Sequence, residues 1–152
     1  MRLSNFLKPE HVFLNLEVVS RDDLMSQVTQ RLGSVGTIRH PETVAELLLD
    51  RERLGSTVVD EEAAIPHCKV PGLKSIVAAF ARTATPVPFG EASARLFFFV
   101  LSPREQPAAH LQVLAGIARL LRNPQAREAC RQAESGEDLL AALTRLDPGN
   151  SS

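Results

Sequence analysis

The chain of 152 residues carries 17 Lys and Arg against 18 Asp and Glu, and 44% of its residues are hydrophobic. These values fit one soluble globular domain and argue against general binding to nucleic acid or anionic membranes, which favours a clustered basic excess. No apolar run approaches the roughly 20 residues of a membrane helix, and the N-terminus lacks a signal-peptide pattern, so we expect a cytoplasmic protein that is not embedded in a membrane. Its two cysteines, Cys68 and Cys130, show no metal-binding or redox spacing and predict reduced thiols.

The first elements are a strand and a helix. The stretch 11–19 alternates in hydrophobicity and predicts a strand with Val12, Leu14 and Leu16 on one side. After Ser20, a predicted helix cap, apolar residues recur every four positions and predict an amphipathic helix over 21–32.

A second helix is predicted from Pro41 to the glycine at position 55, because proline suits a first helical turn and glycine a C-terminal end. Arg51 falls on or beside its apolar stripe. This arginine either extends past the stripe to water or binds an anion at the edge of a site. The predicted buried face consists of Val44, Leu47, Leu48 and Leu54.

The second half begins with a short apolar strand over 75–83, and Pro86 and Pro88 predict a connector after it. The continuous apolar run 95–101 predicts a central strand covered on both faces. Three helices are predicted to follow, one from about Ala108, one from Pro124 to about Ala133, and one from Ser135 to Leu146.

Helices and strands are interspersed, so we expect a single domain over 1–147 with one mixed sheet flanked by helices, of the α/β or α+β class. The polar residues 148–152 are predicted to be a flexible tail.

Two of the four histidines, His11 and His40, are expected at the surface. His110 falls in the first turn of a largely apolar helix, so it is either a hydrogen-bonded core residue or a functional one. A helix N-terminus offers free amides and partial positive charge, which suits a bound anion and favours neutral imidazole.

His67 directly follows an Ile-Pro pair. Because proline lacks an amide proton, we expect strand pairing to end there and His67 to lie at the sheet edge, where a neutral imidazole can act as a nucleophile. Ser56 and Thr57 either donate hydrogen bonds to a phosphate or cap the turn after the second helix. The acidic run 60–62 is read as a solvated loop.

Two other constellations compete with this interpretation. His67, Cys68 and His110 would be zinc ligands, but adjacent ligands are rare and no fourth ligand is evident. A Cys68 nucleophile with a histidine base lacks a triad signature. We therefore predict neither a metal nor a cofactor.

Three stretches, RERLGST, AAIPHCKVPGL and, about forty residues later, HLQVLAGIARLL, resemble the type 2 IIA components of the bacterial phosphotransferase system. This family includes fructose and mannitol IIA domains and the nitrogen-regulatory IIA protein. The resemblance runs from the FLKPEHVFLNL opening to the last helix. The LGST and PVPF segments are most similar to those of the nitrogen-regulatory branch.

The resemblance implies a mixed sheet with helices on both faces. It implies that His67 is phosphorylated by a small HPr-like phosphocarrier and that His110 stabilises the phosphoryl group. Arg51, Ser56 and Thr57 would contact the phosphate, and Glu61 matches a pocket position that is acidic in some members. Targets in this branch tend to be potassium transport and sensor-kinase proteins.

The chain departs from the nitrogen-regulatory branch where glycines are usual, at Val58, Asp60 and Glu62. Carboxylates near a dianionic phosphoryl group would repel it, so a slowed transfer is one expectation. The alternatives are a sugar-specific IIA component that feeds a membrane permease and, in another class, a degenerate binding module without phosphotransfer.

Overall fold

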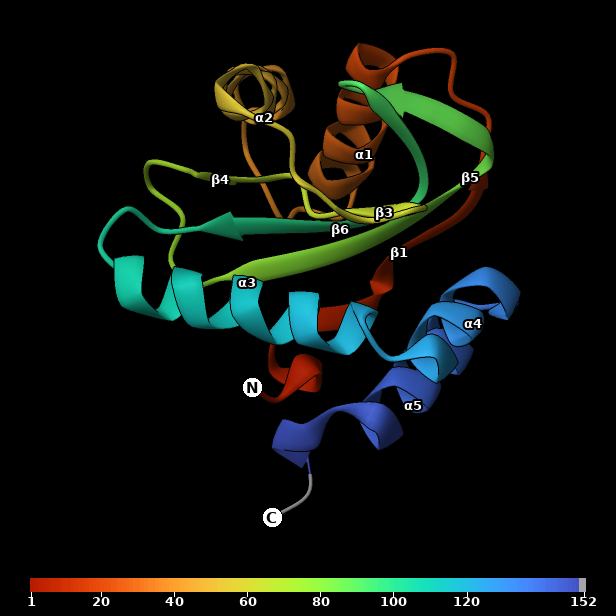
Figure 1. Cartoon of the computed structure of the whole chain (residues 1–152). Helices are drawn as coiled ribbons and strands as arrows, with labels where there is room; N and C mark the ends of the chain where they lie inside the picture. The colour runs from red at the N-terminus through yellow and green to blue at the C-terminus, as the bar shows by residue number, and fades with distance from the viewer. Residues whose placement is uncertain (151–152) are drawn as a thin grey trace.

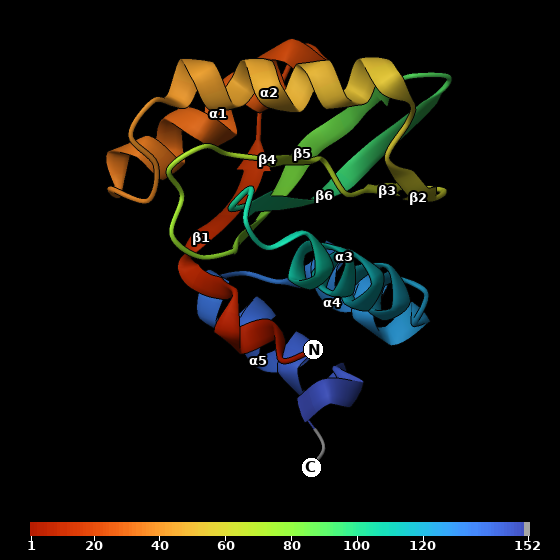
Figure 2. The same cartoon turned by 90° about the vertical axis from the view of Figure 1, so that its left-hand side faces the viewer.

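A mixed sheet of six strands lies between two layers of helices in the computed structural model, which describes residues 1–150 (Figure 1). This arrangement confirms the predicted fold class. One face carries α1 (Arg21–Ser34) and α2 (Pro41–Leu54), as the turned view in Figure 2 also shows. The other face carries α3 (Pro107–Leu121), α4 (Pro124–Gln132) and α5 (Gly136–Leu146), and short 3-10 turns lie at Leu3–Asn5 and Pro148–Asn150.

The strands are ordered β1-β5-β6-β3-β2, and β4 also pairs with β6. Their bounds are β1 (Leu7–Leu16), β2 (Val58–Asp60), β3 (Ala63–Ala64), β4 (His67–Lys69), β5 (Val77–Phe89) and β6 (Ala92–Ser102). β5 and β6 form an antiparallel hairpin, whereas β1 is parallel to β5, and β3 and β4 are parallel to β6. The predicted central strand is therefore β6, which the remaining strands flank on both sides.

Three consecutive phenylalanines on β6 explain why the core has two halves. Side chains of a strand point alternately to opposite faces. Phe98 packs against Phe80 in the cluster that α3 to α5 cover, with ring centroids 4.9 Å apart. Phe97 packs against Phe89 at 5.3 Å in the cluster that α1 and α2 cover.

Hydroxyl and amide side chains cap three of the helices as the sequence predicts. Ser20 and Ser135 accept hydrogen bonds from the amides three residues on, and Asn123 accepts one from Gln125. Each such cap stabilises its helix by about 1 kcal/mol.

The predicted buried face of α2 is partly wrong. Leu54 is 83% exposed and Leu47 only half-buried, whereas Leu49 and Glu52 are buried. Leu54 is the last helical residue, where the chain turns away at Gly55, so it has no layer to pack against. Glu52 is tolerated because its carboxylate accepts a hydrogen bond from Thr57.

β1 begins four residues before the predicted strand 11–19 and ends three residues before its end, and two positions within it also differ from the prediction. Asn15 has a positive φ of 57°, and after it Leu16 joins the core under α1 and α2 while Val12 and Leu14 face the other helices. His11, expected at the surface, is 6% exposed because the loop between α1 and α2 folds over it, and its Nε2 lies 2.8 Å from the Thr37 hydroxyl. His40 is exposed, as predicted.

The prolines at 86 and 88 lie inside β5 rather than in a connector. Pairing with β6 is irregular between Arg82 and Val87, where the missing amide of Pro86 is tolerated. It resumes at Val87 opposite Ala94 and continues at Pro88 opposite Ser93. None of the helices within residues 1–150 is long and apolar enough to cross a membrane.

Candidate functional site

His67 begins β4, which pairs in parallel with the C-terminal end of β6, and its register partner is Val100. The prediction that pairing stops at Pro66 is therefore wrong. Pro66 needs no amide here, since its carbonyl accepts a hydrogen bond from the Val100 amide at 3.0 Å. Proline is compatible with an edge strand when only its carbonyl faces the neighbour.

The half-buried ring of His67 is held by one backbone contact, a distance of 2.7 Å between Nδ1 and the Ile65 carbonyl oxygen. A carbonyl can only accept, so Nδ1 must carry the proton. In the neutral ring Nε2 then has a free lone pair. Burial lowers the pKa of His67, and the nearby positive charge of Arg51 lowers it further. The hydrogen bond to the Ile65 carbonyl raises the pKa, but by less than burial lowers it. These effects favour the neutral form of the ring, in which Nε2 carries the lone pair.

His110 lies beside this ring although it comes from the first turn of α3. The two ring centroids are 5.5 Å apart and the ring planes are inclined by 52°. The His110 side chain is buried, and its Nδ1 lies 2.6 Å from the hydroxyl oxygen of Ser102, the last residue of β6. Burial lowers the pKa of His110, and the positive forms of His67 and Lys69 add to that effect.

Arg51 is half-buried in the last turn of α2. Its guanidinium donates a hydrogen bond to the Gly55 carbonyl at 3.0 Å, which orients the side chain along the helix end. Its charge acts on His67, so α2 brings a cation to the histidine pair. An arginine in this position can bind phosphate oxygens in a bidentate manner.

The two hydroxyls that follow α2 have different surroundings. The Ser56 hydroxyl accepts from the Val58 amide, and its side chain lies against Gly90 in the turn between β5 and β6. The Thr57 hydroxyl is buried and donates to Glu52, while its carbonyl accepts from the Ile65 amide. Within residues 1–150 no hydrogen bond joins either side chain to the histidines. Thr57 instead fixes the backbone two residues before His67.

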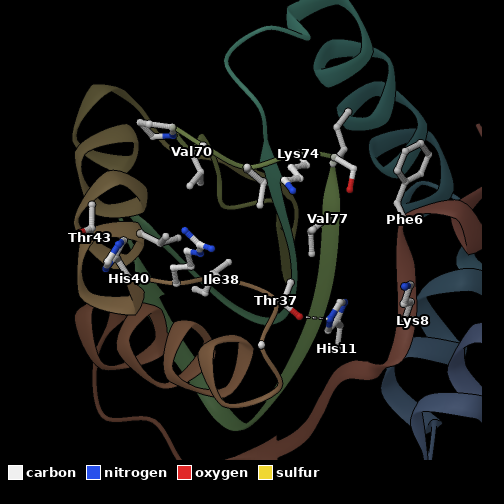
Figure 3. A pocket seen from close by; sticks show the side chains of 18 of the residues that line it. Phe6, Lys8, His11, Thr37, Ile38, His40, Thr43, Val70, Lys74 and Val77 are labelled. Carbon is white, nitrogen blue, oxygen red and sulfur yellow. Dashed lines mark hydrogen bonds between the residues drawn. The ribbon is translucent and has the colours of Figure 1, made fainter.

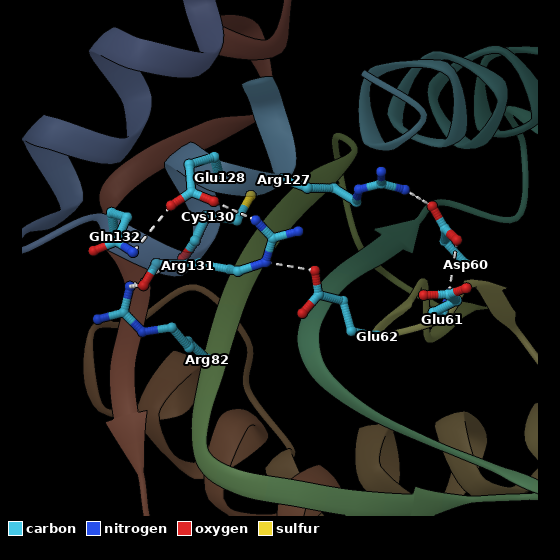
Figure 4. A network of polar contacts seen from close by, with 9 residues as sticks. All are labelled: Asp60, Glu61, Glu62, Arg82, Arg127, Glu128, Cys130, Arg131 and Gln132. Carbon is cyan, nitrogen blue, oxygen red and sulfur yellow. Dashed lines mark hydrogen bonds and ion pairs between the residues drawn. The ribbon is translucent and has the colours of Figure 1, made fainter. Parts of the chain in front are cut away.

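The acidic run comprises Asp60, the last residue of β2, and the two glutamates of the turn to β3, and it lies beside α4 (Figure 4). Asp60 forms an ion pair with Arg127, and Glu62 one with Arg131 at 2.7 Å. β3 and β4 both pair in parallel with β6. The register partners of Ala63 and His67, Leu96 and Val100, are four residues apart, which corresponds to roughly 13 Å along that strand. Asp60 and Glu62 are therefore paired with α4, and the exposed Glu61 lies beside them in the same turn.

Two groups of the site, the Ile65 carbonyl and Ser102, were not predicted from the sequence. A backbone oxygen carries no sequence signal. Ser102, however, ends the apolar run of the central strand, and the position after such a strand is a common place for functional side chains. Among residues 1–150 no group of three His, Cys, Asp or Glu side chains is arranged to hold a metal ion.

The family model described as "Phosphoenolpyruvate-dependent sugar phosphotransferase system, EIIA 2" matches residues 5–145. A nitrogen regulatory protein from Bradyrhizobium diazoefficiens is 32% identical over 146 residues, covering 94% of this chain and 95% of that protein. The crystal structure of the nitrogen regulatory protein IIA-Ntr from Neisseria meningitidis is similar with a TM-score of 0.84 and 31% identity, covering 93% of this chain and 98% of that one.

A sugar-system relative also matches. The 2-O-alpha-mannosyl-D-glycerate-specific EIIABC component from Escherichia coli is 28% identical over 148 residues, which cover 94% of this chain but 22% of that longer protein. The similarity therefore extends over nearly the whole chain in both branches.

Proposed function

The chain belongs to the type 2 IIA family of the phosphoenolpyruvate-dependent sugar phosphotransferase system, and on that premise we propose that Nε2 of His67 accepts a phosphoryl group from an HPr-like phosphocarrier. The observation that carries the proposal is the 2.7 Å contact between Nδ1 and the Ile65 carbonyl, because it leaves Nε2 with its lone pair.

In this transfer the nitrogen–phosphorus bond of the donor phosphohistidine breaks as the bond from His67 Nε2 to phosphorus forms. The Nδ1 proton stays on His67, so the ring gains positive charge, which the Ile65 carbonyl dipole stabilises. The donor ring leaves with the electron pair of the broken bond. The reaction needs alignment and charge stabilisation more than covalent machinery.

His110 and Arg51 are the groups that would stabilise the transferring phosphoryl oxygens. The Ser102 hydroxyl can donate to Nδ1 of His110, which leaves the Nε2 proton of that ring available as a donor. The first turn of α3 adds partial positive charge, since its N-cap residue Gln106 makes no side-chain capping bond.

Exposed leucines suit the approach of a protein donor. Leu111, next to His110, is 65% exposed, and Leu54, one turn after Arg51, is 83% exposed. Apolar groups at these positions would exclude water from the paired active sites and so limit hydrolysis of the phosphohistidine.

Nearly full-length similarity to nitrogen regulatory proteins favours a regulatory role in the cytoplasm. In this role the phosphorylation state of His67 is read by targets such as potassium transport or sensor-kinase proteins. The sugar-specific alternative, delivery to a permease, is supported by the mannosylglycerate relative. The alternative of a degenerate binding module rests mainly on the acidic run, whose charge would repel a phosphoryl group. The ion pairs of Asp60 and Glu62 with arginines of α4 weaken that argument.

The test is incubation of the protein with an enzymatically phosphorylated HPr-like carrier, followed by intact-mass measurement. We expect an acid-labile increase equal to one HPO3 on His67, which His67→Ala abolishes. Glu134→Gln, an exposed change in the linker between α4 and α5, is the control and keeps the adduct. An adduct that persists in His67→Ala would refute the assignment. Transfer onward to a separately purified IIB domain would favour the sugar role over the regulatory one.

A further inference from the structure

A cavity of about 1000 Å³ is lined by neither His67 nor His110. Figure 3 shows the side chains that line it. Its walls are the loop 36–40 before α2, the loop 70–77 after β4, and the segment 5–8 at the start of β1. None of its lining residues belongs to the proposed phosphoryl site. The volume is at the upper end of that of pockets for small organic ligands.

The side chains that line this cavity have a net positive charge, whereas the whole chain is slightly negative. Lys8, Arg39 and Lys74 all line it, and no Asp or Glu is among its lining residues, although the chain has a formal net charge of -1. These cations come from three separate segments, and the fold brings them to one concave surface. Concave sites lined with one sign of charge concentrate ions of the other sign.

The N-terminus of α2 opens onto the same cavity through His40 and Thr43. His40 is the N-cap residue, and its side chain makes no capping hydrogen bond. The first amides of a helix have no partner within the helix and add partial positive charge. Glu42 is in this first turn as well, but its exposed carboxylate is near Gln30 and does not line the cavity.

The wall of the cavity that faces the start of α2 has both polar and apolar side chains. His11 presents a buried ring whose Nε2 lies 2.8 Å from the Thr37 hydroxyl, and the backbone of Ala78 interacts with the same ring. Apolar side chains complete the wall, among them Ile38, Ile76 and Val77.

We propose that this cavity binds a small organic anion with at least two negative charges, of the class of phosphorylated or polycarboxylate metabolites. The charged groups lie among Lys8, Arg39, Lys74 and the first amides of α2. The uncharged part rests on the wall formed by His11, Ile38 and Val77. This site is separate from phosphotransfer at His67, and the two can succeed or fail independently.

The experiment is a titration of the isotope-labelled protein, followed by amide NMR, with glucose 6-phosphate, citrate and uncharged glucose as probes at near-physiological salt. Saturable shifts confined to 36–43 and 70–77 are expected with one or both anions and none with glucose. A response to glucose 6-phosphate alone or to citrate alone identifies the anionic group.

The double variant Arg39→Ala/Lys74→Ala should weaken binding about tenfold or more, the equivalent of one lost charge-assisted hydrogen bond. Both residues are exposed, so the fold should persist. Arg122→Ala, an exposed cation after α3, is the matched control and should bind as the wild type does.

Three outcomes would overturn the proposal. They are no saturable shift with either anion, equal weakening by Arg122→Ala, and shifts confined to amides around His67 and His110. The last would place the anion in the phosphoryl site and so leave the proposed function intact. The titration should give the same cavity shifts in His67→Ala.

Discussion

The hydroxyl oxygen of Ser102 lies 2.6 Å from Nδ1 of His110, and both residues are buried. This contact joins the end of the central strand to the first turn of α3. It fixes the His110 ring beside His67 and, when the hydroxyl donates, selects the tautomer that carries its proton on Nε2. Ser102 is therefore a positioning residue for the proposed transfer.

Ser102→Ala should slow phosphorylation of His67 about fivefold, because the loss of one neutral hydrogen bond of about 1 kcal/mol frees the His110 tautomer. Ring nitrogen NMR shifts of His110 should change as well, which a purely structural role of Ser102 would not produce. Ser93→Ala, an exposed change in the same strand, is the control. Unchanged ring shifts in Ser102→Ala would exclude the positioning role.

His110→Ala should lower the transfer rate by about 10²–10³, the range for removing one donor to a developing charge. Phosphorylation should still reach completion, because the nucleophile remains. The measurement is rapid-quench transfer from the labelled carrier. A rate within twofold of the wild type would show that His110 does not contact the phosphoryl group.

The double variant Asp60→Asn/Glu62→Gln should change the transfer rate by less than about twofold, since both carboxylates are paired with α4 and separated from His67. The free energy of unfolding should fall by about 1 kcal/mol or less, because such partly exposed pairs stabilise weakly. Asp50→Asn removes a similar exposed pair with Arg53 and serves as the comparison. A large acceleration would mean that the acidic turn does repel the phosphoryl group.

Stability should fall as the pH drops below about 6.5, the ordinary pKa of histidine. Burial lowers the pKa of His11, His67 and His110 in the folded state, so the unfolded chain binds more protons in this window. The stability that neutral rings contribute is complete above the ordinary pKa and is lost as the pH falls through the folded values. Thermal unfolding between pH 5 and 8 measures it, and His11→Asn should give a shallower slope.

The lowered pKa of His67 also affects how the rate of phosphoryl transfer depends on pH. His67 should stay nucleophilic to a pH below the ordinary histidine pKa, and its rate should decline only when Nε2 becomes protonated. Ring-proton NMR of His67 gives its titration directly. A midpoint above 6.5 would contradict the buried, neutral ring.

Much of the fold could be predicted because it depends on local chemistry. The caps at Ser20, Asn123 and Ser135, the four-residue spacing in α1 and the apolar run of β6 each fix an element within a few residues. Errors occurred where tertiary packing decides. A loop distant in sequence covers His11, and the ends of helices and strands determine what Leu54 and Pro66 face.

For the site, the sequence by itself carried the resemblance to the family, and that resemblance singled out His67, His110 and Arg51, since a sequence motif is a local property. Only the tertiary structure decided that the two rings lie 5.5 Å apart, that the Ile65 carbonyl leaves Nε2 free, and that α4 neutralises the acidic turn. The physical reason is that these contacts join backbone oxygens and side chains from different elements. Their partners are set by how the helices pack on the sheet, which no local pattern encodes.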